Sequence, residues 1–167
     1  MSTTLQPSYS ASGAGTSITI TSAATLANGN AAGCTGIDNT GSLYIDATVQ
    51  ILATLANTSP GSDQLINIWF AASEDGTNYT STNGANLDNY TGADAAVTLQ
   101  SPTLFRGPFS IPTPNQNLAT RVIIPSVVKF FGGLVLPKKW GFIVENRSGM
   151  AFTAFSAEFT GINMKNV

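Results

Sequence analysis

Histidine is absent from this chain, and cysteine occurs once, at Cys34. Without histidine, neither a Ser-His-Asp nor a Cys-His catalytic arrangement can be built, and the commonest zinc and non-haem iron sites are excluded as well. A single cysteine also excludes an intramolecular disulfide and a thiolate metal cluster. The sequence therefore predicts a protein that is made in a reducing compartment and has no disulfide framework.

Charge is also sparse. Charged residues make up 10% of the sequence, against about 25% in a typical domain, and the formal net charge is −2. Residues 1–100 contain no lysine or arginine, while seven of the nine acidic residues lie there. A nucleic-acid-binding protein needs a broad basic surface, so we do not expect nucleic acid as a partner. Because few charges oppose self-association, the composition favours a protein that works in an assembly.

Long apolar runs are missing too. The most apolar window, residues 122–136, is interrupted by Pro125, Lys129 and two glycines, so it is too short and too broken to span a bilayer. The N-terminus has no basic region followed by an apolar run, which is the pattern of a signal peptide. We therefore expect neither a membrane span nor a secretory signal.

Two-residue alternation is the strongest pattern that is present. Every second residue between 43 and 55 is apolar, which predicts one long strand over these thirteen residues. Residues 65–72 alternate in the same way, and this run ends at Asp75-Gly76, a pair that turns the chain back. The two runs predict a hairpin of buried strands.

Shorter alternating runs predict further strands. They fall at 18–20, 95–99, 105–109, 118–124, 140–144 and 150–162, with 127–131 as a continuation or a separate short strand. We expect a loop over residues 24–41 and a bulge near Thr153, where the last run changes phase. No segment has a helical period with caps. The prediction is an all-β fold: a single antiparallel β-sandwich of jelly-roll type, with about eight strands and almost no helix. An immunoglobulin-like topology stays open.

The chain length suits one domain, and no internal repeat divides it. Residues 1–15 are rich in Ser, Thr and Gly and predict an extended N-terminal arm, which we expect to order only against a neighbouring molecule. Residues 16–167 form the single sandwich domain. We expect the following residues in its core: Ile45, Val49, Ile51, Ile66, Ile68, Phe70, Phe142, Val144, Phe155 and Phe159.

No residue is predicted to be catalytic or to bind a cofactor. Asp88 and Asp94 flank a polar loop that would suit Ca²⁺, but solvated acids are the favoured interpretation. Four aromatic residues would suit a carbohydrate-binding sandwich, in which they stack on sugar rings: Trp69, Tyr79, Tyr90 and Trp140. We favour a core position for Trp140 and an interface position for Trp69.

Two short motifs carry a resemblance. Residues 73–79 read SEDGTNY, a strand end followed by a hairpin turn, and residues 140–149 read WGFIVENRSG, a strand followed by Asn, a turn and Gly. Within residues 43–161 these motifs resemble the small virion proteins of tailed bacteriophages, although the Pro-rich segment is split here between 111–114 and 124–125.

The resemblance implies a non-enzymatic structural role, as a decoration or cement protein on the outer capsid surface. It implies the major capsid protein or other virion proteins as partners, and a place in the virion after assembly in the host cytoplasm. The alternative function is a carbohydrate-binding or host-recognition module of a phage tail or head fibre.

The side of the 65–73 strand opposite its core-facing side carries Leu65 and Trp69. Soluble monomers seldom leave such an apolar patch exposed. We therefore predict a homo-oligomer with Trp69, Leu65, Tyr79 and Tyr90 at the interface. A trimer is implied by how phage decoration proteins commonly assemble, and not by any residue of this chain.

Overall fold

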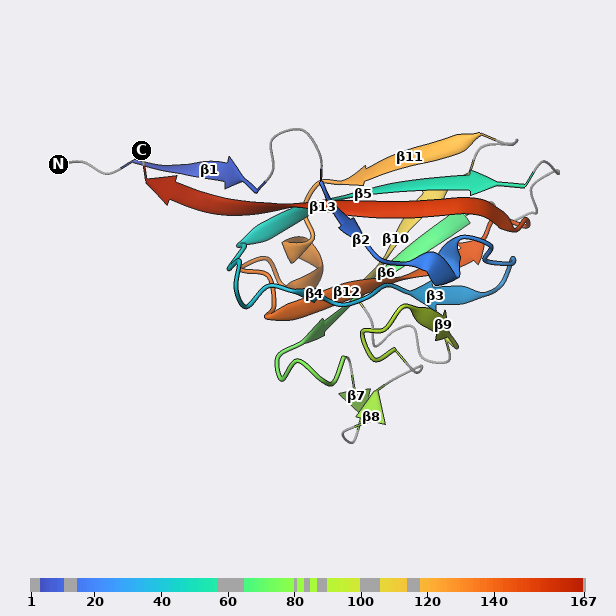
Figure 1. Cartoon of the computed structure of the whole chain (residues 1–167), viewed down its shortest axis with the longest axis horizontal. Helices are drawn as coiled ribbons and strands as arrows, with labels where there is room; N and C mark the ends of the chain where they lie inside the picture. Colours follow the sequence, from blue (N-terminus) through green and yellow to red (C-terminus); the bar gives the residue numbers. More distant parts are fainter. Residues whose placement is uncertain are drawn as a thin grey trace.

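Two antiparallel sheets face each other in the computed structural model of the chain (Figure 1). The structure describes residues 4–10, 15–56, 65–79, 81–82, 85–86, 90–99, 106–113 and 118–166. Sheet A consists of β1 (Leu5–Tyr9), β2 (Thr16–Ile18), β5 (Asp46–Leu55), β11 (Ala119–Ile124) and β13 (Phe152–Asn166). Sheet B consists of β3 (Ala31–Gly33), β4 (Ile37–Asp38), β6 (Leu65–Ser73), β9 (Ala95–Val97), β10 (Arg106–Pro112) and β12 (Lys139–Arg147). A separate small hairpin pairs β7 (Ser81–Thr82) with β8 (Ala85–Asn86).

Eight of these strands pair as one long hairpin that is rolled up. The outermost pair is β2 with β13, and three pairs are nested inside it: β3 with β12, β5 with β11 and β6 with β10. Most connections cross from one sheet to the other, so the roll closes around a single core. This nested pairing is a jelly roll and confirms the predicted antiparallel sandwich. It also decides against the immunoglobulin-like topology.

The core lies between the two sheets and follows the predicted alternation. In β5, buried and half-buried residues alternate without interruption from Asp46 to Leu55. Phe70 of β6 is fully buried and stacks on Phe130, with 4.4 Å between the ring centroids. Nearly all of the predicted core residues are buried, and Ile45 and Phe155 are half-buried. Removing these side chains from water is the main stabilising contribution to the sandwich.

Four local expectations are corrected. The hairpin expected from residues 43–55 and 65–72 does not form, because β5 belongs to sheet A and β6 belongs to sheet B. The strand expected from residue 43 begins only at Asp46, because Leu43 has a positive φ of 52° and its side chain is 71% exposed. The run expected as a strand at 127–131 is instead the 3₁₀ helix η4 (Val128–Phe131), which ends at Gly132 with a φ of 100°. The loop expected over 24–41 contains β3, whose small residues give no strand signal, and β4, which is only two residues long.

The bulge expected near Thr153 is confirmed, since the pairing of β13 with β5 shifts register between Phe152 and Ala154. The helical segments of the described residues are short turns such as η1 (Thr21–Ala23) and η4. None of them is long and apolar enough to cross a membrane.

The two ends of the chain form a ribbon that projects from the sandwich (Figure 1). Residues 5–9 of β1 pair in antiparallel register with residues 162–166 of β13, whereas β5 follows β13 only as far as Ile162. The segment expected to be an arm is therefore extended, but at residues 5–9 it pairs with its own chain. This corrects the expectation that the arm orders only against a neighbour.

Candidate functional site

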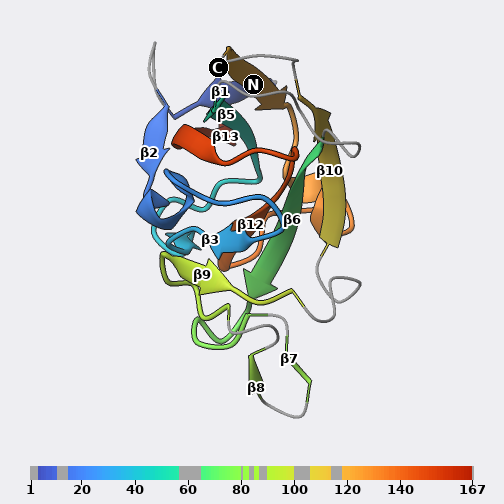
Figure 2. The same ribbon diagram turned by 90° about the vertical axis from the view of Figure 1, so that its right-hand side faces the viewer.

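The outer face of sheet B is covered by the segment that connects β6 to β10. Figure 2 shows the β7–β8 hairpin on the side of sheet B that faces away from sheet A, while β9 pairs with β3 at the edge of the sheet. Within the described part of this segment, Tyr79, Tyr90 and Val97 pack against Ala71 and Ile143 of the sheet in a second hydrophobic cluster. The chain thus buries an apolar sheet face that a two-layer sandwich alone would leave in water.

Glycines make room for the two tyrosines of this cover. A Cβ at Gly33 or Gly141 would overlap Tyr90, and a Cβ at Gly36 would overlap Tyr79, each at well under 3.0 Å. The Tyr90 hydroxyl donates to the Cys34 carbonyl oxygen at 2.9 Å, and its side chain is only 1% exposed. The tyrosines therefore hold the connecting segment on the sheet by close contact with bare backbone.

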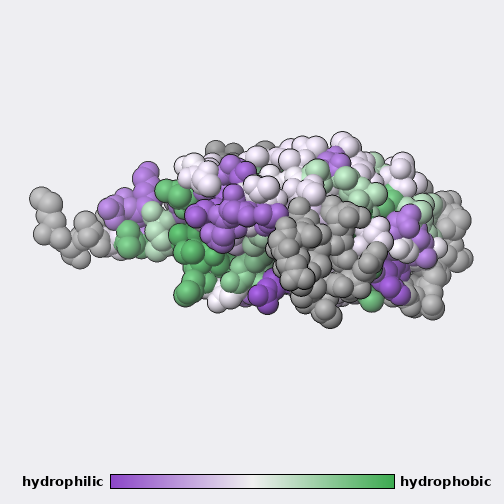
Figure 3. Space-filling view, turned by 90° about the horizontal axis from the view of Figure 1, so that it is seen from below, coloured by the Kyte–Doolittle hydropathy of each residue, from purple (hydrophilic) through white to green (hydrophobic). Residues whose placement is uncertain are grey.

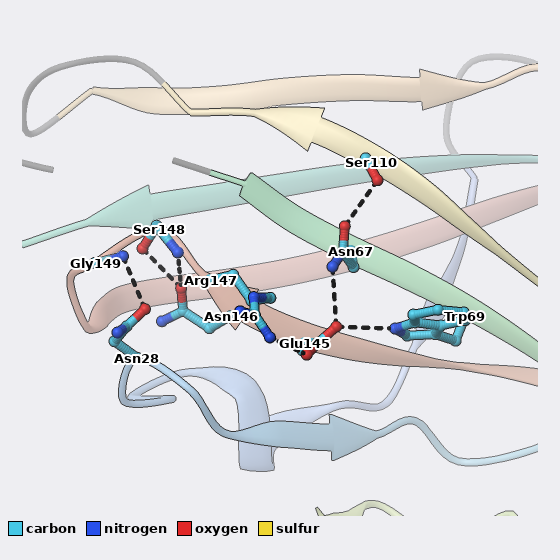
Figure 4. Close-up of polar contacts among 9 residues, drawn as sticks. All are labelled: Asn28, Asn67, Trp69, Ser110, Glu145, Asn146, Arg147, Ser148 and Gly149. Atoms are coloured by element: carbon cyan, nitrogen blue, oxygen red, sulfur yellow. Dashed lines mark hydrogen bonds and ion pairs between the residues drawn. The ribbon is translucent and has the colours of Figure 1, made fainter. Parts of the chain in front are cut away.

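A polar group of side chains lies beside this cover, on β6, β10 and β12 (Figure 4). Glu145 is its centre, because register places it opposite Asn67 and its side chain is 14% exposed. Its Oε2 accepts from Asn67 Nδ2 at 2.9 Å and from Trp69 Nε1 at 3.1 Å, and Arg147 Nη1 lies 3.3 Å from Oε1. Asn67 Oδ1 in turn accepts from Ser110 Oγ at 2.8 Å. The carboxylate thereby fixes the orientation of the Trp69 indole.

Glu145 and Arg147 border a hollow of about 470 Å³ between β12 and the β3–β9 edge. Its other lining residues are small or apolar except for the polar Asn30 and Thr98, and Glu145 carries the single carboxylate of the described lining. Hydrolysis of a glycoside needs two carboxyl groups on either side of the bond, so the hollow can bind but lacks that catalytic pair. The hollow is therefore a candidate binding site.

The predicted Ca²⁺ alternative rests on Asp94, since Asp88 lies outside the described residues. Asp94 Oδ2 accepts hydrogen bonds from the backbone N–H of Thr21 at 2.7 Å and from its hydroxyl at 2.6 Å. Asp94 Oδ1 accepts hydrogen bonds from the backbone N–H of Ser22 at 2.9 Å and from its hydroxyl at 2.5 Å. Burial would raise the pKa of Asp94, but these hydrogen bonds outweigh it and hold the pKa at about 2. Asp94 therefore fastens the covering segment to η1, and no group of three metal-ligating side chains occurs among the residues that the structure describes.

Cys34, like Asp94, contributes to the fold and not to chemistry. Burial raises the pKa of its thiol to about 11, and the backbone N–H of Phe142 donates to Sγ at 3.2 Å. A thiol with so high a pKa is not a nucleophile at neutral pH.

The second candidate surface is the apolar side of the terminal ribbon. Cross-strand partners share a face, and the pairs are Leu5 with Asn166, Pro7 with Met164 and Tyr9 with Ile162. One face therefore carries five apolar residues, all exposed except the half-buried Ile162, and the other face carries Gln6, Ser8, Asn163 and Lys165.

An apolar knob, made of Leu43, Leu134 and Val135, lies at the same end of the molecule. Figure 3 shows hydrophobic residues gathered where the ribbon leaves the body. Asn163 Nδ2, on the polar face of the ribbon, donates to the Ser42 carbonyl at 3.3 Å, and the nearby Leu136 N–H donates to the Ile45 carbonyl at 3.1 Å. The knob thus lies on the side of the ribbon opposite its apolar face.

The structure separates the four predicted interface residues. Tyr79, 3% exposed, and Tyr90 are buried in the chain's own fold, so the expectation that they offer a contact surface is corrected. Leu65 and Trp69 are half-buried on the outer face of sheet B, and Trp140 is in the core as favoured.

Neither the hydrogen bonds of Glu145 with Asn67 and Trp69 nor the apolar ribbon face was predicted from the sequence. The sequence signals for the ribbon face are the alternations of apolar and polar residues in Leu5-Gln6-Pro7-Ser8-Tyr9 and in Ile162-Asn163-Met164, and each is too short to stand out alone. Comparison with protein-family models, curated proteins and solved structures gives no match to the chain.

Proposed function

We propose that this chain is a non-enzymatic structural protein of a virion, a decoration protein that binds the outer capsid surface and other copies of itself. The jelly roll supports the proposal, because this fold recurs in capsid and lectin domains. The location in a virion is proposed from the resemblance of residues 73–79 and 140–149 to phage virion proteins alone.

One observation carries the binding role. Large hydrophobic side chains stay exposed at the end where the ribbon projects, among them Leu5, Tyr9, Leu134 and Val135. With only 10% charged residues, the chain has little electrostatic means of keeping such a surface apart from other proteins. A surface of this kind suits a protein that spends its working life in an assembly.

Sedimentation with capsids tests the proposal. The purified chain is mixed with tailed-phage capsids that lack decoration, and bound protein is quantified after pelleting. Saturable binding at a fixed number of copies per capsid is expected, whereas a chain that stays in the supernatant at every concentration would refute the capsid role. Serum albumin at equal mass serves as the control for trapping in the pellet.

A carbohydrate-binding role is the second candidate, and the Glu145 group favours it. Glu145 lines the hollow, and its carboxylate holds the Trp69 indole and the Asn67 amide by hydrogen bonds. A carboxylate with an indole and an amide beside it suits a polyhydroxylated ligand. Against it, Tyr79, Tyr90 and Trp140 are buried and have no ring face to offer a sugar.

A glycan array distinguishes the two candidates. The carbohydrate role predicts a saccharide that binds the wild type and binds Glu145→Gln at least tenfold more weakly, since one acceptor charge is lost. Sedimentation with capsids in the absence of any glycan signal supports the structural role alone.

A further inference from the structure

The terminal ribbon has an apolar face without a partner among the described residues. A two-stranded ribbon is marginally stable by itself in water. This one is anchored at its root, where Ser10 N donates to the Gly161 carbonyl at 2.8 Å and Gly161 N donates to Ser10 Oγ at 2.9 Å. Beyond Ile162, β13 pairs with β1 alone, and Leu5, Pro7 and Met164 point into solvent. A surface that covers this face would stabilise the ribbon.

The ribbon offers its face rather than its edge. Pro7 lies in the middle of β1 and has no backbone N–H, so it blunts the free edge of the strand against pairing with another strand. Contact through the side chains of the apolar face is the mode that remains.

The chain itself carries a matching surface. The apolar knob of Leu43, Leu134 and Val135 is exposed, with Leu134 at 88%, and lies on the other side of the same ribbon. A twofold contact of ribbon with ribbon would leave both knobs in water, and a contact of knob with knob would leave both ribbons in water. A head-to-tail contact covers both surfaces at once.

We propose that the apolar ribbon face of one copy docks on the apolar knob of the next copy, in a closed head-to-tail ring. One such contact uses eight large side chains, fewer than the 20–30 residues a side of a standard interface. A ring holds each copy at two such contacts, which favours closure over an open dimer. The inference deepens the proposed function and rests on it for its biological setting, but the isolated protein tests it.

Multi-angle light scattering on three variants provides the test. Tyr9→Asp/Met164→Asp places charge on the ribbon face, and Leu134→Asp places charge on the knob. The matched control is Leu118→Asp, which makes the same change at a side chain 61% exposed beside β11 at the opposite end of sheet A. We expect wild type and Leu118→Asp at a multiple of 17.3 kDa, and the ribbon and knob variants each at 17.3 kDa.

Mixing the two monomeric variants identifies the geometry. One variant keeps an intact knob and the other keeps an intact ribbon, so the mixture should give particles of twice 17.3 kDa and nothing larger. A mixture that stays monomeric, a knob variant that stays oligomeric, or a monomeric wild type at micromolar concentration would each overturn the ring.

Folding is checked by circular dichroism, and Leu5→Asp at the ribbon tip replaces the double variant if that variant unfolds. Capsid sedimentation keeps the two proposals apart. A monomeric wild type that still binds capsids refutes the ring and leaves the decoration role intact, and a ring that never binds capsids does the reverse.

Discussion

The outer face of sheet B and one face of the terminal ribbon are both apolar strand surfaces outside the core. The chain covers only the face of sheet B with its own residues. On sheet B, Tyr79 and Tyr90 reach bare backbone at glycines and seal the face with the chain's own segment. On the ribbon, Leu5, Tyr9 and Met164 stay exposed. An apolar outer strand face therefore does not by itself indicate an interface, because a long connection of the same chain can cover it.

The covering tyrosine should contribute as much to stability as a core ring. Tyr90→Ala removes a ring that is buried like that of Phe70, so we expect both Tyr90→Ala and Phe70→Ala to lower the free energy of unfolding by about 3–5 kcal/mol. Urea unfolding measures the change. Tyr90→Phe keeps the ring and loses the hydrogen bond to Cys34, so about 1 kcal/mol is expected there. If Tyr90→Ala has the same free energy of unfolding as the wild type, the covering segment is not packed on the outer face of sheet B.

Gly141→Ala should lower the free energy of unfolding by about 1–3 kcal/mol, since the new Cβ would overlap the Tyr90 hydroxyl and displace it. Gly41→Ala is the matched control, because nothing lies within 4 Å of a Cβ at that position. It should change stability by less than about 0.5 kcal/mol. Equal changes in stability for the two substitutions would contradict the claim that Gly141 is needed to make room for Tyr90.

Asp94 ties the far end of the cover to η1, and its contribution should depend on pH. The pKa of Asp94 is about 2 in the folded protein and near 3.8 when unfolded, so the unfolded chain binds more protons between these values. Its stabilisation is present above about pH 4 and is lost as the pH falls towards 2, and solvent screening limits it to about 1 kcal/mol. The stability gap between wild type and Asp94→Asn should therefore narrow from about pH 5 to pH 2. A constant gap would show that the carboxylate charge is unimportant.

The knob should give the smallest effect on stability. Leu134 is exposed, so Leu134→Asp should shift the free energy of unfolding of the monomer by less than about 0.5 kcal/mol while it abolishes association. Denaturation at a concentration too low for assembly measures this shift. A loss of several kcal/mol would place Leu134 in the fold and not on a contact surface.

Much of the sandwich could be predicted from the sequence, because core-facing strand positions must be apolar and recur every second residue. Residues 46–55 and 65–73 show this pattern over their whole length. β3 could not be predicted, since Ala31, Ala32 and Gly33 lack the bulky side chains that mark a strand. Gly33 has to be this small because a Cβ there would overlap Tyr90.

The candidate surfaces could be predicted less well. Alternation showed that β6 has two apolar sides, but it does not tell which later segment lies over the outer one. The sequence therefore predicts an interface position for Tyr79 and Tyr90, whereas both are packed within their own chain. The ribbon escaped prediction because its two halves lie at opposite ends of the sequence, and only their pairing creates the apolar face.

Hydroxyl-radical footprinting at two protein concentrations tests most directly which surface associates, because tryptophan, tyrosine and methionine side chains all react in the same experiment. As the concentration rises, labelling of Tyr9 and Met164 on the ribbon should fall, while labelling of Trp69 on sheet B stays constant. Protection of Trp69 with no change at Tyr9 and Met164 would contradict the ribbon contact and restore the face of sheet B as the interface.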